Sequence, residues 1–585
     1  MSAPSNDELK TLLLDHYHCT FFLPLIGLPD EFKPEATRKT YPAGSASSEC
    51  DAQAFHFFTP ILRNILFDRG TEDTEHSPQT LTPMREWYLP QEVIQPWRMT
   101  LHKADGDKDV TPLTQQTALF QSVQLFRYFN GIYVLAFTVT PEVLPPLQER
   151  VKQKRNELAE AEKQIPVEER KPAWELDKEA DATVSLFAGS IQKLADVSPY
   201  DPDRDVYPKL QLEAWLRFSR LGRQLYRSFT EQGDESKIAK LCLNSVTGET
   251  LKTAFDESMK KLEMPEHPGK DLSPIIIFLL QQFFKPQAAA LETWLKQNIA
   301  LYDDRMFISV AYGLAGKQHT DETLHKINTL AGFTDRVADC WVEDYPYTAE
   351  VTDRYLQGKC FDLWKAVGSN YFYTDRVNAY VSNGGFFRRS IATCHIPHLY
   401  NRMLVQALFY QASLRHYDHK MIETTLTLLK DQDKIKLIKE QLEAFIRFTN
   451  QYWFPELTDQ MQGKEIFRLQ QQGLNLQVHY ERIKEKISRT DEYLNAQREA
   501  HSSDLSNALS QLSTKLTHWG AAFALGALYL AVLPVLNDMV KDFNTPSLSL
   551  WQWGAKHLHE GGMTLLVALP LVALISWAWI KRPKP

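Results

Sequence analysis

The run Asn383-Gly-Gly-Phe-Phe-Arg-Arg-Ser390 combines adjacent glycines with two phenylalanines and two arginines. Glycines leave backbone N–H groups accessible, guanidinium groups form forked hydrogen bonds with phosphate, and aromatic rings stack on planar bases. Six side chains in and near this run could bind a ligand that carries both a phosphate and a planar base. They are Tyr373, Arg376, Phe386, Phe387, Arg388 and Arg389. The same run also fits a hairpin turn with core phenylalanines and surface arginines.

Histidine and cysteine side chains could bind a metal ion. His16, His18 and Cys19 lie close together, but adjacent residues of a strand face opposite sides and no second pair follows them. His395 and His398 form another candidate pair, which also fits an ordinary structural role. The six cysteines are scattered without CxxC spacing, which predicts reduced structural thiols in a cytosolic chain. The sequence leaves a metal site undefined.

The sequence lacks the common motifs of catalysis. It contains no P-loop, no GxGxxG after a strand, no HExxH and no nucleophile elbow, so we predict that the chain is not an enzyme. The formal net charge of −8 argues against direct nucleic-acid binding, although it is compatible with a local basic pocket. With 585 residues, the chain is long enough for two or three packed domains.

Residues 1–150 have the pattern of a cytosolic α/β part with a sheet. Apolar runs at Thr20–Ile26 and Phe55–Phe58 are bounded by proline and glycine and are attributed to this sheet. The strongest local signal is Val123–Val139, where Asn130-Gly131 separates two β-rich runs. Asn-Gly predicts a hairpin with a type I′ turn, because both central residues of that turn need positive φ.

A second α/β part is predicted after a charged segment. Residues 151–182 are rich in charge and predict a solvent-exposed helix and linker. The second sheet-containing part is placed at residues 183–398, where Met306–Tyr312 has the pattern of a buried strand. Asp303-Asp-Arg305 fits a turn with an internal ion pair.

From about Leu399 the apolar residues recur at helical spacing, which predicts a helical stalk at residues 399–515. Pro455 interrupts the pattern, because proline cannot continue a helix interior. A further helix is predicted from about Lys464 to Gly473. Beyond Gly473 nothing breaks the helical pattern before the apolar tail.

One apolar stripe continues along this last helix into the tail. Its members recur at alternating spacings of four and three, namely Leu505, Leu509, Leu512, Leu516, Trp519, Phe523, Gly526, Leu530 and Leu533. Sustained spacing of this kind predicts a seam that packs against copies of the same helix or against the chain's own domain. Ala522 and Gly526 allow close approach of helices within lipid.

Two uncharged apolar stretches lie near the C-terminal end of the sequence, Trp519–Leu536 and Met563–Ile580. Each has about 18 residues, the lower practical length for a helix that crosses about 30 Å of hydrocarbon. We therefore predict membrane-spanning helices at residues 516–540 and 563–580, an outer loop at 541–562 and a basic tail at 581–585. The alternative is burial of both stretches as a hairpin in a soluble core.

Charges around the two stretches predict their orientation. Lys581, Arg582 and Lys584 close the chain and Lys515 precedes the first stretch, so the positive-inside bias places both flanks in the cytoplasm. The N-terminus has neither a basic nor an apolar signal-peptide region. The large N-terminal part is therefore expected in the cytosol.

This arrangement resembles the CorA superfamily of divalent-cation channels over the whole chain. Those proteins have a cytosolic α/β domain, a long stalk helix that continues into the first span, a short outer loop, a second span and a basic cytosolic tail. The resemblance implies a homo-oligomer, a pentamer, in a lipid bilayer, with Mg²⁺ or a similar divalent cation as the ion. The expected fold class is an α/β cytosolic domain followed by long stalk helices and a C-terminal two-helix transmembrane hairpin.

The superfamily has a Gly-Met-Asn signature at the outer end of the first span, where this chain has Val535-Leu-Asn-Asp-Met539. By this resemblance, Asn537 could present its amide to a hydrated cation, and Asp538 from each copy would add a ring of negative charge. Thr517 and His518 would lie near the inner mouth of the pore. The alternative for Asn537 and Asp538 is the end of a helix that meets water.

Three segments look like the divergent CorA-like membrane effectors of type III CRISPR systems, namely Asp303–Phe307, Gln406–Leu414 and Phe454–Phe467. In that group, the resemblance implies a nucleotide second messenger, such as a conjugate of S-adenosylmethionine with AMP, that binds the cytosolic domain and alters the pore in antiviral defence. It also implies a multi-pass protein of the bacterial inner membrane with both termini in the cytoplasm. The alternatives are a constitutive divalent-cation transporter and a membrane-anchored scaffold with no pore.

Overall fold

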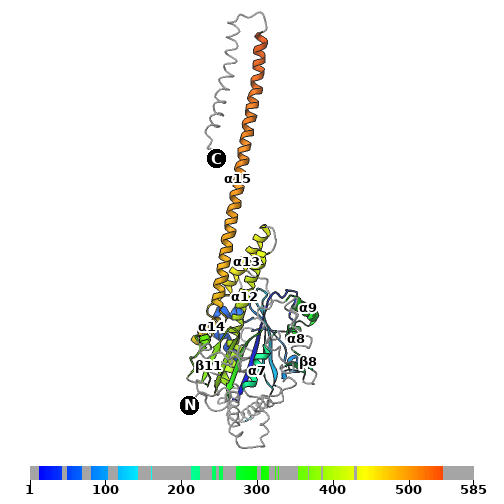
Figure 1. Ribbon diagram of the computed structural model, residues 1–585, viewed down its shortest axis with the longest axis vertical. Coiled ribbons are helices and arrows are strands. Elements are labelled where there is room, and N and C mark those ends of the chain that lie inside the picture. The colour runs from blue at the N-terminus through cyan, green and yellow to red at the C-terminus, as the bar shows by residue number, and fades with distance from the viewer. Residues whose placement is uncertain are drawn as a thin grey trace, which may run out of the picture. The chain divides into compact units, whose positions relative to one another are not determined.

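The computed structural model describes residues 12, 14–41, 49–68, 81–102, 116–142, 160, 212–223, 225, 240–245, 250–253, 272–298, 305–314, 323–324, 327, 354–365, 368–383, 386–426 and 431–543. The chain divides into two compact units, Met1–Glu485 and Lys486–Pro585. A mixed β-sheet with helices packed on it makes up the described part of the first unit, and a single helix makes up that of the second (Figure 1).

The described strands of the sheet follow the order β10-β11-β12-β9-β1-β6-β5-β4-β7-β8, with β3 paired to β5 and β2 paired to β3. Among these strands, β12 and β9 are parallel and the other pairs are antiparallel. Their bounds are β1 (Leu14–Leu25), β2 (Thr37–Lys39), β3 (Arg85–Tyr88), β4 (Trp97–His102), β5 (Gln116–Arg127), β6 (Tyr133–Pro141), β7 (Lys240–Ser245), β8 (Thr250–Thr253), β9 (Phe307–Leu314), β10 (Cys360–Phe361), β11 (Ser369–Tyr373) and β12 (Val377–Asn383).

Strands from both predicted α/β parts join in this one sheet. β1 pairs with β6 along one edge and with β9 along the other. The strand predicted at Met306–Tyr312 is confirmed as β9, which is buried along its whole length. Apolar runs mark the strands, but the partner of each strand depends on contacts between distant parts of the chain.

The hairpin predicted at residues 123–139 is confirmed, with a different turn. β5 and β6 are antiparallel neighbours, but only Gly131 of the Asn130-Gly131 pair has positive φ, at 76°. The type I′ prediction was therefore wrong, and the turn has the glycine placement of a longer hairpin loop. Phe129 stacks on Tyr452 with 3.8 Å between ring centroids, and the amide of Asn130 donates to Ser413 Oγ at 3.0 Å. These tertiary contacts select the wider loop.

Helices pack on both faces of the sheet and continue after it in the sequence (Figure 1). The described helices are α2 (Glu49–Phe57), α3 (Pro60–Leu66), α4 (Gln91–Ile94), α7 (Leu212–Gly222), α8 (Pro274–Phe283), α9 (Ala288–Asn298), α12 (Asn401–Leu426), α13 (Asp431–Gln451), α14 (Met461–Gly473) and α15 (Leu476–Phe543), with the 3-10 turn η7 (Lys285–Gln287) and the π-helix η9 (Phe387–Tyr400). Phe55–Phe58, attributed to the sheet, lies at the end of α2 instead. Aromatic residues favour a strand only where their rings can pack on the surface of a sheet.

Alternation along β1 separates an apolar face of the sheet from a polar one. Tyr17 and Phe21 point into the main hydrophobic core, where the rings of Tyr17 and Trp215 of α7 are 4.6 Å apart. His18 and Thr20 occupy the intervening positions and are also buried. Their side of the sheet is covered by α12, since Asn401 of that helix donates to Thr20 Oγ1 at 3.2 Å.

The helical pattern predicted after Leu399 is confirmed. α12 and α13 precede the break around Pro455, α14 ends at Gly473 as predicted, and α15 continues without interruption to Phe543.

α15 contains the first predicted span. By length and composition, its segment Ser502–Asp538 could cross a membrane, with a mean hydropathy of 1.9 in its most apolar window and none of that window buried. The predicted second span at residues 563–580 and the basic tail lie outside the described residues, as does the predicted outer loop after Phe543.

Candidate ligand-binding site

A pocket of about 250 Å³ lies between the sheet, α12 and the turn that joins α14 to α15. Its described lining includes three arginines, Arg305, Arg376 and Arg415. One histidine, His479, and one carboxylate, Asp375, complete the titratable groups among these lining residues. The surplus of guanidinium groups makes the pocket suited to an anion.

Three different elements position the arginines. Arg305 stands just before β9, Arg376 lies in the turn from β11 to β12, and Arg415 projects from α12. The parallel pairing of β9 with β12 brings the first two together, because the carbonyl of Arg376 accepts a hydrogen bond from the N–H of Ile308 at 3.0 Å. Thr374 fixes the turn, since its Oγ1 accepts from the N–H of Arg376 at 3.3 Å.

The end of α14 approaches this turn closely because Gly473 has no side chain. A Cβ atom at Gly473 would lie 2.6 Å from the carbonyl oxygen of Thr374. Asn475 then takes a left-handed conformation, with φ of 52°, and the chain turns from α14 into α15. This path brings Leu474 and His479 to the wall of the pocket.

The electrostatics of the pocket favour phosphate. Asp375 lies 3.9 Å from the Nε atom of Arg376 and also accepts a hydrogen bond from the hydroxyl of Tyr355. It therefore offsets one of the three guanidinium charges, and a net positive charge is left on the described lining. Guanidinium groups that converge from several directions can bind the oxygens of one phosphate at once.

His479 is neutral near pH 7. Burial lowers the pKa of His479, and the guanidinium groups of Arg415 and Arg482 lower it further, while Asp418 acts in the opposite direction. An anion bound beside His479 would favour its protonated form. The residue can therefore respond to the charge of a ligand.

The wall of the pocket includes the beginning of the helix that carries the apolar segment. His479 lies in the first turn of α15 (Leu476–Phe543), and the candidate span Ser502–Asp538 belongs to the same helix. A ligand that contacts His479 therefore contacts the start of this helix.

Of the predicted ligand residues whose side chains are described, only Arg376 lines the pocket. Tyr373 is fully buried next to the turn that carries Arg376. Phe387 is buried, and its ring lies 6.4 Å from that of Tyr371, so it belongs to the core. Phe386 is 60 % exposed at the start of η9. These two phenylalanines do not form a stacking site in the pocket.

The run Asn383–Ser390 joins a strand to a helix, so the alternative of a hairpin turn was wrong. β12 ends at Asn383 and η9 begins at Phe387. The two glycines of the run and the side chains of Arg388 and Arg389 lie outside the described part of the chain. Phosphate binding by these two arginines stays a prediction.

The sequence does not single out Arg415 or His479, and it predicts only a turn at Arg305. Arg415 lies on α12 and His479 on α15, where single charged or polar residues are ordinary features of a helix surface. No local pattern indicates that they meet. Only the strand pairing and the α14–α15 turn bring them together.

The four residues predicted to line a pore lie on α15. Thr517 Oγ1 donates to a backbone carbonyl one turn earlier at 2.7 Å, and His518 Nδ1 lies 2.7 Å from another such carbonyl. Asn537 and Asp538 are exposed near the end of the apolar segment. Their position facing a pore stays a prediction.

The candidate metal-binding histidines have other contacts. His16 Nε2 lies 2.9 Å from His18 Nδ1, and both belong to β1. Burial lowers the pKa of His16 to about 4 and, with the help of His16, lowers the pKa of His18 well below its usual range. His398 Nδ1 lies 3.2 Å from Asp51 Oδ1, while burial lowers the pKa of His395. Within the described ranges, no three metal-ligating side chains form a group.

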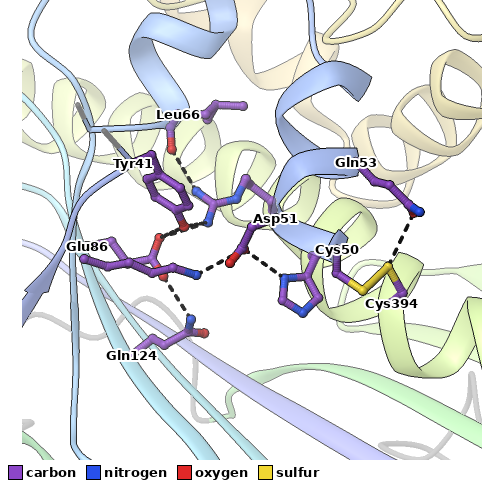
Figure 2. Close-up of polar contacts among 11 residues, drawn as sticks. Tyr41, Cys50, Asp51, Gln53, Leu66, Glu86, Gln124 and Cys394 are labelled. Atoms are coloured by element: carbon purple, nitrogen blue, oxygen red, sulfur yellow. Dashed lines mark hydrogen bonds and ion pairs between the residues drawn. A yellow bond between two sulfur atoms is a disulfide. The ribbon is translucent and has the colours of Figure 1, made fainter. Parts of the chain in front are cut away.

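A buried ion pair joins α12 to the sheet (Figure 2). Arg402 Nη2 lies 2.9 Å from Glu86 Oε2, and the two side chains are 9 % and 1 % exposed. The guanidinium group also donates to Tyr41 Oη and to the carbonyl of Leu66, each at 2.7 Å, and Gln124 donates to Glu86 at 3.0 Å. Burial would lower the pKa of Arg402, but Tyr41 and Glu86 outweigh it and the pKa is raised. Arg402 therefore stays charged.

A disulfide between Cys50 and Cys394 links α2 to η9 beside this network (Figure 2). The Cα atoms are 5.6 Å apart, although the residues are separated by 344 positions in the sequence. The prediction of reduced thiols was wrong for this pair, because sequence spacing does not reveal a contact between such distant residues. Cys19 and Cys360 are free, and burial raises the pKa of Cys360 to about 12.

Reduction of the Cys50–Cys394 disulfide should lower the free energy of unfolding by about 2–4 kcal/mol, because the bond limits the unfolded chain. Urea unfolding of the detergent-solubilised chain, with and without a phosphine reductant, measures the difference. The double variant C50S/C394S should match the reduced protein and should not respond to the reductant. Equal stability of the oxidised and reduced protein would contradict the prediction.

No protein-family model, curated protein or solved structure matches this chain. The fold and the site alone therefore define its class. Its described residues form a mixed-sheet domain with an arginine-lined pocket, helices after it, and one helix apolar and long enough to cross a membrane.

Proposed function

We propose that this chain is a CorA-like membrane effector whose cytosolic domain binds a nucleotide second messenger in the arginine-lined pocket and so controls an ion-conducting pore. The observation that carries the proposal is the position of His479, which lines the pocket and stands in the first turn of α15. The same helix contains the apolar segment Ser502–Asp538. Ligand contact and membrane segment thus share one element, which gives a direct route for coupling.

The charge of the pocket supports a phosphate-bearing ligand. Arg305, Arg376 and Arg415 converge on it, and the neutral His479 can take up a proton when an anion binds. Following the resemblance to the CRISPR-associated CorA-like proteins, the ligand is a nucleotide messenger such as a conjugate of S-adenosylmethionine with AMP. The response is then a change of membrane permeability in antiviral defence.

The surface of α15 supports contacts with lipid and with other copies. Four large apolar side chains of the predicted seam are between 65 % and 74 % exposed, namely Leu516, Trp519, Phe523 and Leu530. In the proposed assembly, a homopentamer, these side chains pack between copies. The second span at residues 563–580 completes the hairpin, both termini lie in the cytoplasm at the bacterial inner membrane, and the ion is Mg²⁺ or a similar divalent cation.

Replacing Asp538 with asparagine should lower cation flux by about tenfold, because one carboxylate from each copy would concentrate cations at the pore mouth. Flux of Mg²⁺ into liposomes that contain the full chain measures the effect, with and without added nucleotide. The matched control is Asp504→Asn, since Asp504 is exposed on the same helix near the start of the apolar segment.

Three outcomes of this experiment would contradict parts of the proposal. Unchanged flux in the Asp538→Asn variant would remove Asp538 from the conducting path. Flux that is independent of nucleotide would favour a constitutive transporter. Absence of flux under every condition would favour a membrane-anchored scaffold.

A further inference from the structure

The arginine-lined pocket also has an apolar part. Its described lining includes five apolar side chains that are at most 6 % exposed, namely Leu23, Phe307, Leu408, Ala412 and Leu474. The three arginines of the lining are each half-buried. The apolar side chains therefore form the interior of the pocket, and the arginines lie nearer to the solvent.

The beginning of β9 supplies one residue of each kind. Arg305 stands two residues before Phe307, so in an extended chain their side chains point to the same side and lie about 6.6 Å apart. This is the side that α12 covers, because Ser309, two residues further on, donates to Asn401 of α12 at 2.6 Å. The pocket is therefore a gap between this side of the sheet and α12.

The facing surface of α12 is graded in the same way. Leu408, Gln411, Ala412 and Arg415 line the pocket and recur at the spacing of one helix face. Leu408 is 1 % exposed and Arg415 is half-buried, and they are separated by about 10 Å along the helix axis. On both elements the exposure rises from the apolar residue to the arginine. The pocket thus has an enclosed apolar end and an open cationic end.

The size of the pocket limits its ligand. A volume of about 250 Å³ lies just below the range of about 300–1,000 Å³ that is usual for small-molecule sites. It suits one nucleotide unit and is too small for an oligonucleotide. The separation of the two ends is comparable to that between the phosphate and the base of one nucleotide.

The chemistry of the apolar end fits a base. Phe307 offers an aromatic ring on which a planar base can stack. Gln411 lies between Leu408 and Arg415 on α12, and its amide can donate and accept hydrogen bonds at once. An amide of this kind matches the edge of adenine, which presents a donor beside an acceptor.

We propose that the pocket binds a single nucleoside monophosphate unit, with its phosphate at the three arginines and its base between Phe307 and Gln411. This inference rests on the proposed function, because that function places the phosphate at the arginines. It adds which part of the messenger is enclosed and which residues select it. Since the cationic end is the open one, the base enters first, and any further part of the messenger extends from the phosphate into the solvent.

Calorimetric titration of the detergent-solubilised full chain tests the inference with AMP and ribose 5-phosphate, of which only AMP carries a base. We expect AMP to bind at least about tenfold more tightly, because stacking and the amide contact add to the phosphate contacts. A third probe, diadenosine pyrophosphate, extends AMP through its phosphate and should bind within about tenfold of AMP. A larger gain in affinity would overturn the limit of one enclosed unit.

Two variants place the base. Phe307→Leu keeps an apolar side chain but removes the ring, and Ala412→Leu fills part of the apolar end. Each should reduce the ratio of the AMP and ribose 5-phosphate affinities by about tenfold. The ratio is the readout because a general loss of folded protein does not change it.

The matched control is Phe120→Leu. Phe120 of β5 is 5 % exposed, against 6 % for Phe307, and belongs to the main hydrophobic core, outside the described pocket lining. This variant should keep the ratio of the parent chain. Equal binding of AMP and ribose 5-phosphate by the parent chain, or an unchanged ratio in both pocket variants, would overturn the position of the base and leave the phosphate site in place. Binding of neither probe would overturn the proposed function itself.

Discussion

Replacing Arg402 with methionine should lower the free energy of unfolding by about 3–5 kcal/mol, because the carboxylate of Glu86 would be left buried without its partner. The side chain of Glu86 is 1 % exposed and keeps only the neutral donors Tyr41 and Gln124 among its described contacts. Arg402 also holds the carbonyl of Leu66, so the same change leaves that group unpaired. Urea unfolding of the detergent-solubilised chain, followed by tryptophan fluorescence, measures the loss.

Two further variants test the cause of this loss. Arg468 pairs with Glu465 on the surface of α14, where both side chains are largely exposed, so Arg468→Met should cost less than about 1 kcal/mol. The double variant R402M/E86L should recover much of the stability, because it removes both charges and leaves an apolar contact. Similar losses for Arg402→Met and Arg468→Met would show that burial of the pair is not what makes it important.

The helical half of the described chain could be predicted well from the sequence, because helices depend on local spacing. Leu399 marks the change of pattern, Pro455 marks the break, and Gly473 marks the end of α14 as expected. The same local reasoning found β9 and the β5–β6 hairpin. The prediction failed where contacts between distant residues determine the local conformation. An example is the turn at Asn130, whose amide donates a hydrogen bond to Ser413 of α12.

The candidate site was harder to predict for the same reason. Arg376 was named because it lies near the run Asn383–Ser390 in the sequence, but its partners in the pocket come from β9, α12 and α15. The link between α2 and η9 through Cys50 and Cys394 was missed because these residues are separated by 344 positions. The pairing of β12 with β9 brings the residues of the pocket together. The local sequence does not predict which strands will pair.

Charge reversal of two pocket arginines, R376E/R415E, should weaken binding of AMP by at least about a hundredfold. A charge-assisted hydrogen bond contributes about 1.5–3 kcal/mol, and the two glutamates would in addition repel the phosphate. Arg376 and Arg415 project from different elements and are both partly exposed. Calorimetric titration of the full chain, together with a thermal melt, separates lost binding from lost folding.

The matched comparison is R388E/R389E, the pair that the sequence alone favours. The two double variants have the same change of charge, so a difference between them reports the place of the phosphate and not the net charge of the domain. If the pocket is the site, R376E/R415E loses the ligand and R388E/R389E keeps most of its affinity. The opposite result would move the phosphate to the start of η9 and away from the first turn of α15. His479 would then have no contact with the ligand, and the proposed coupling of ligand binding to the apolar helix would lose its physical basis.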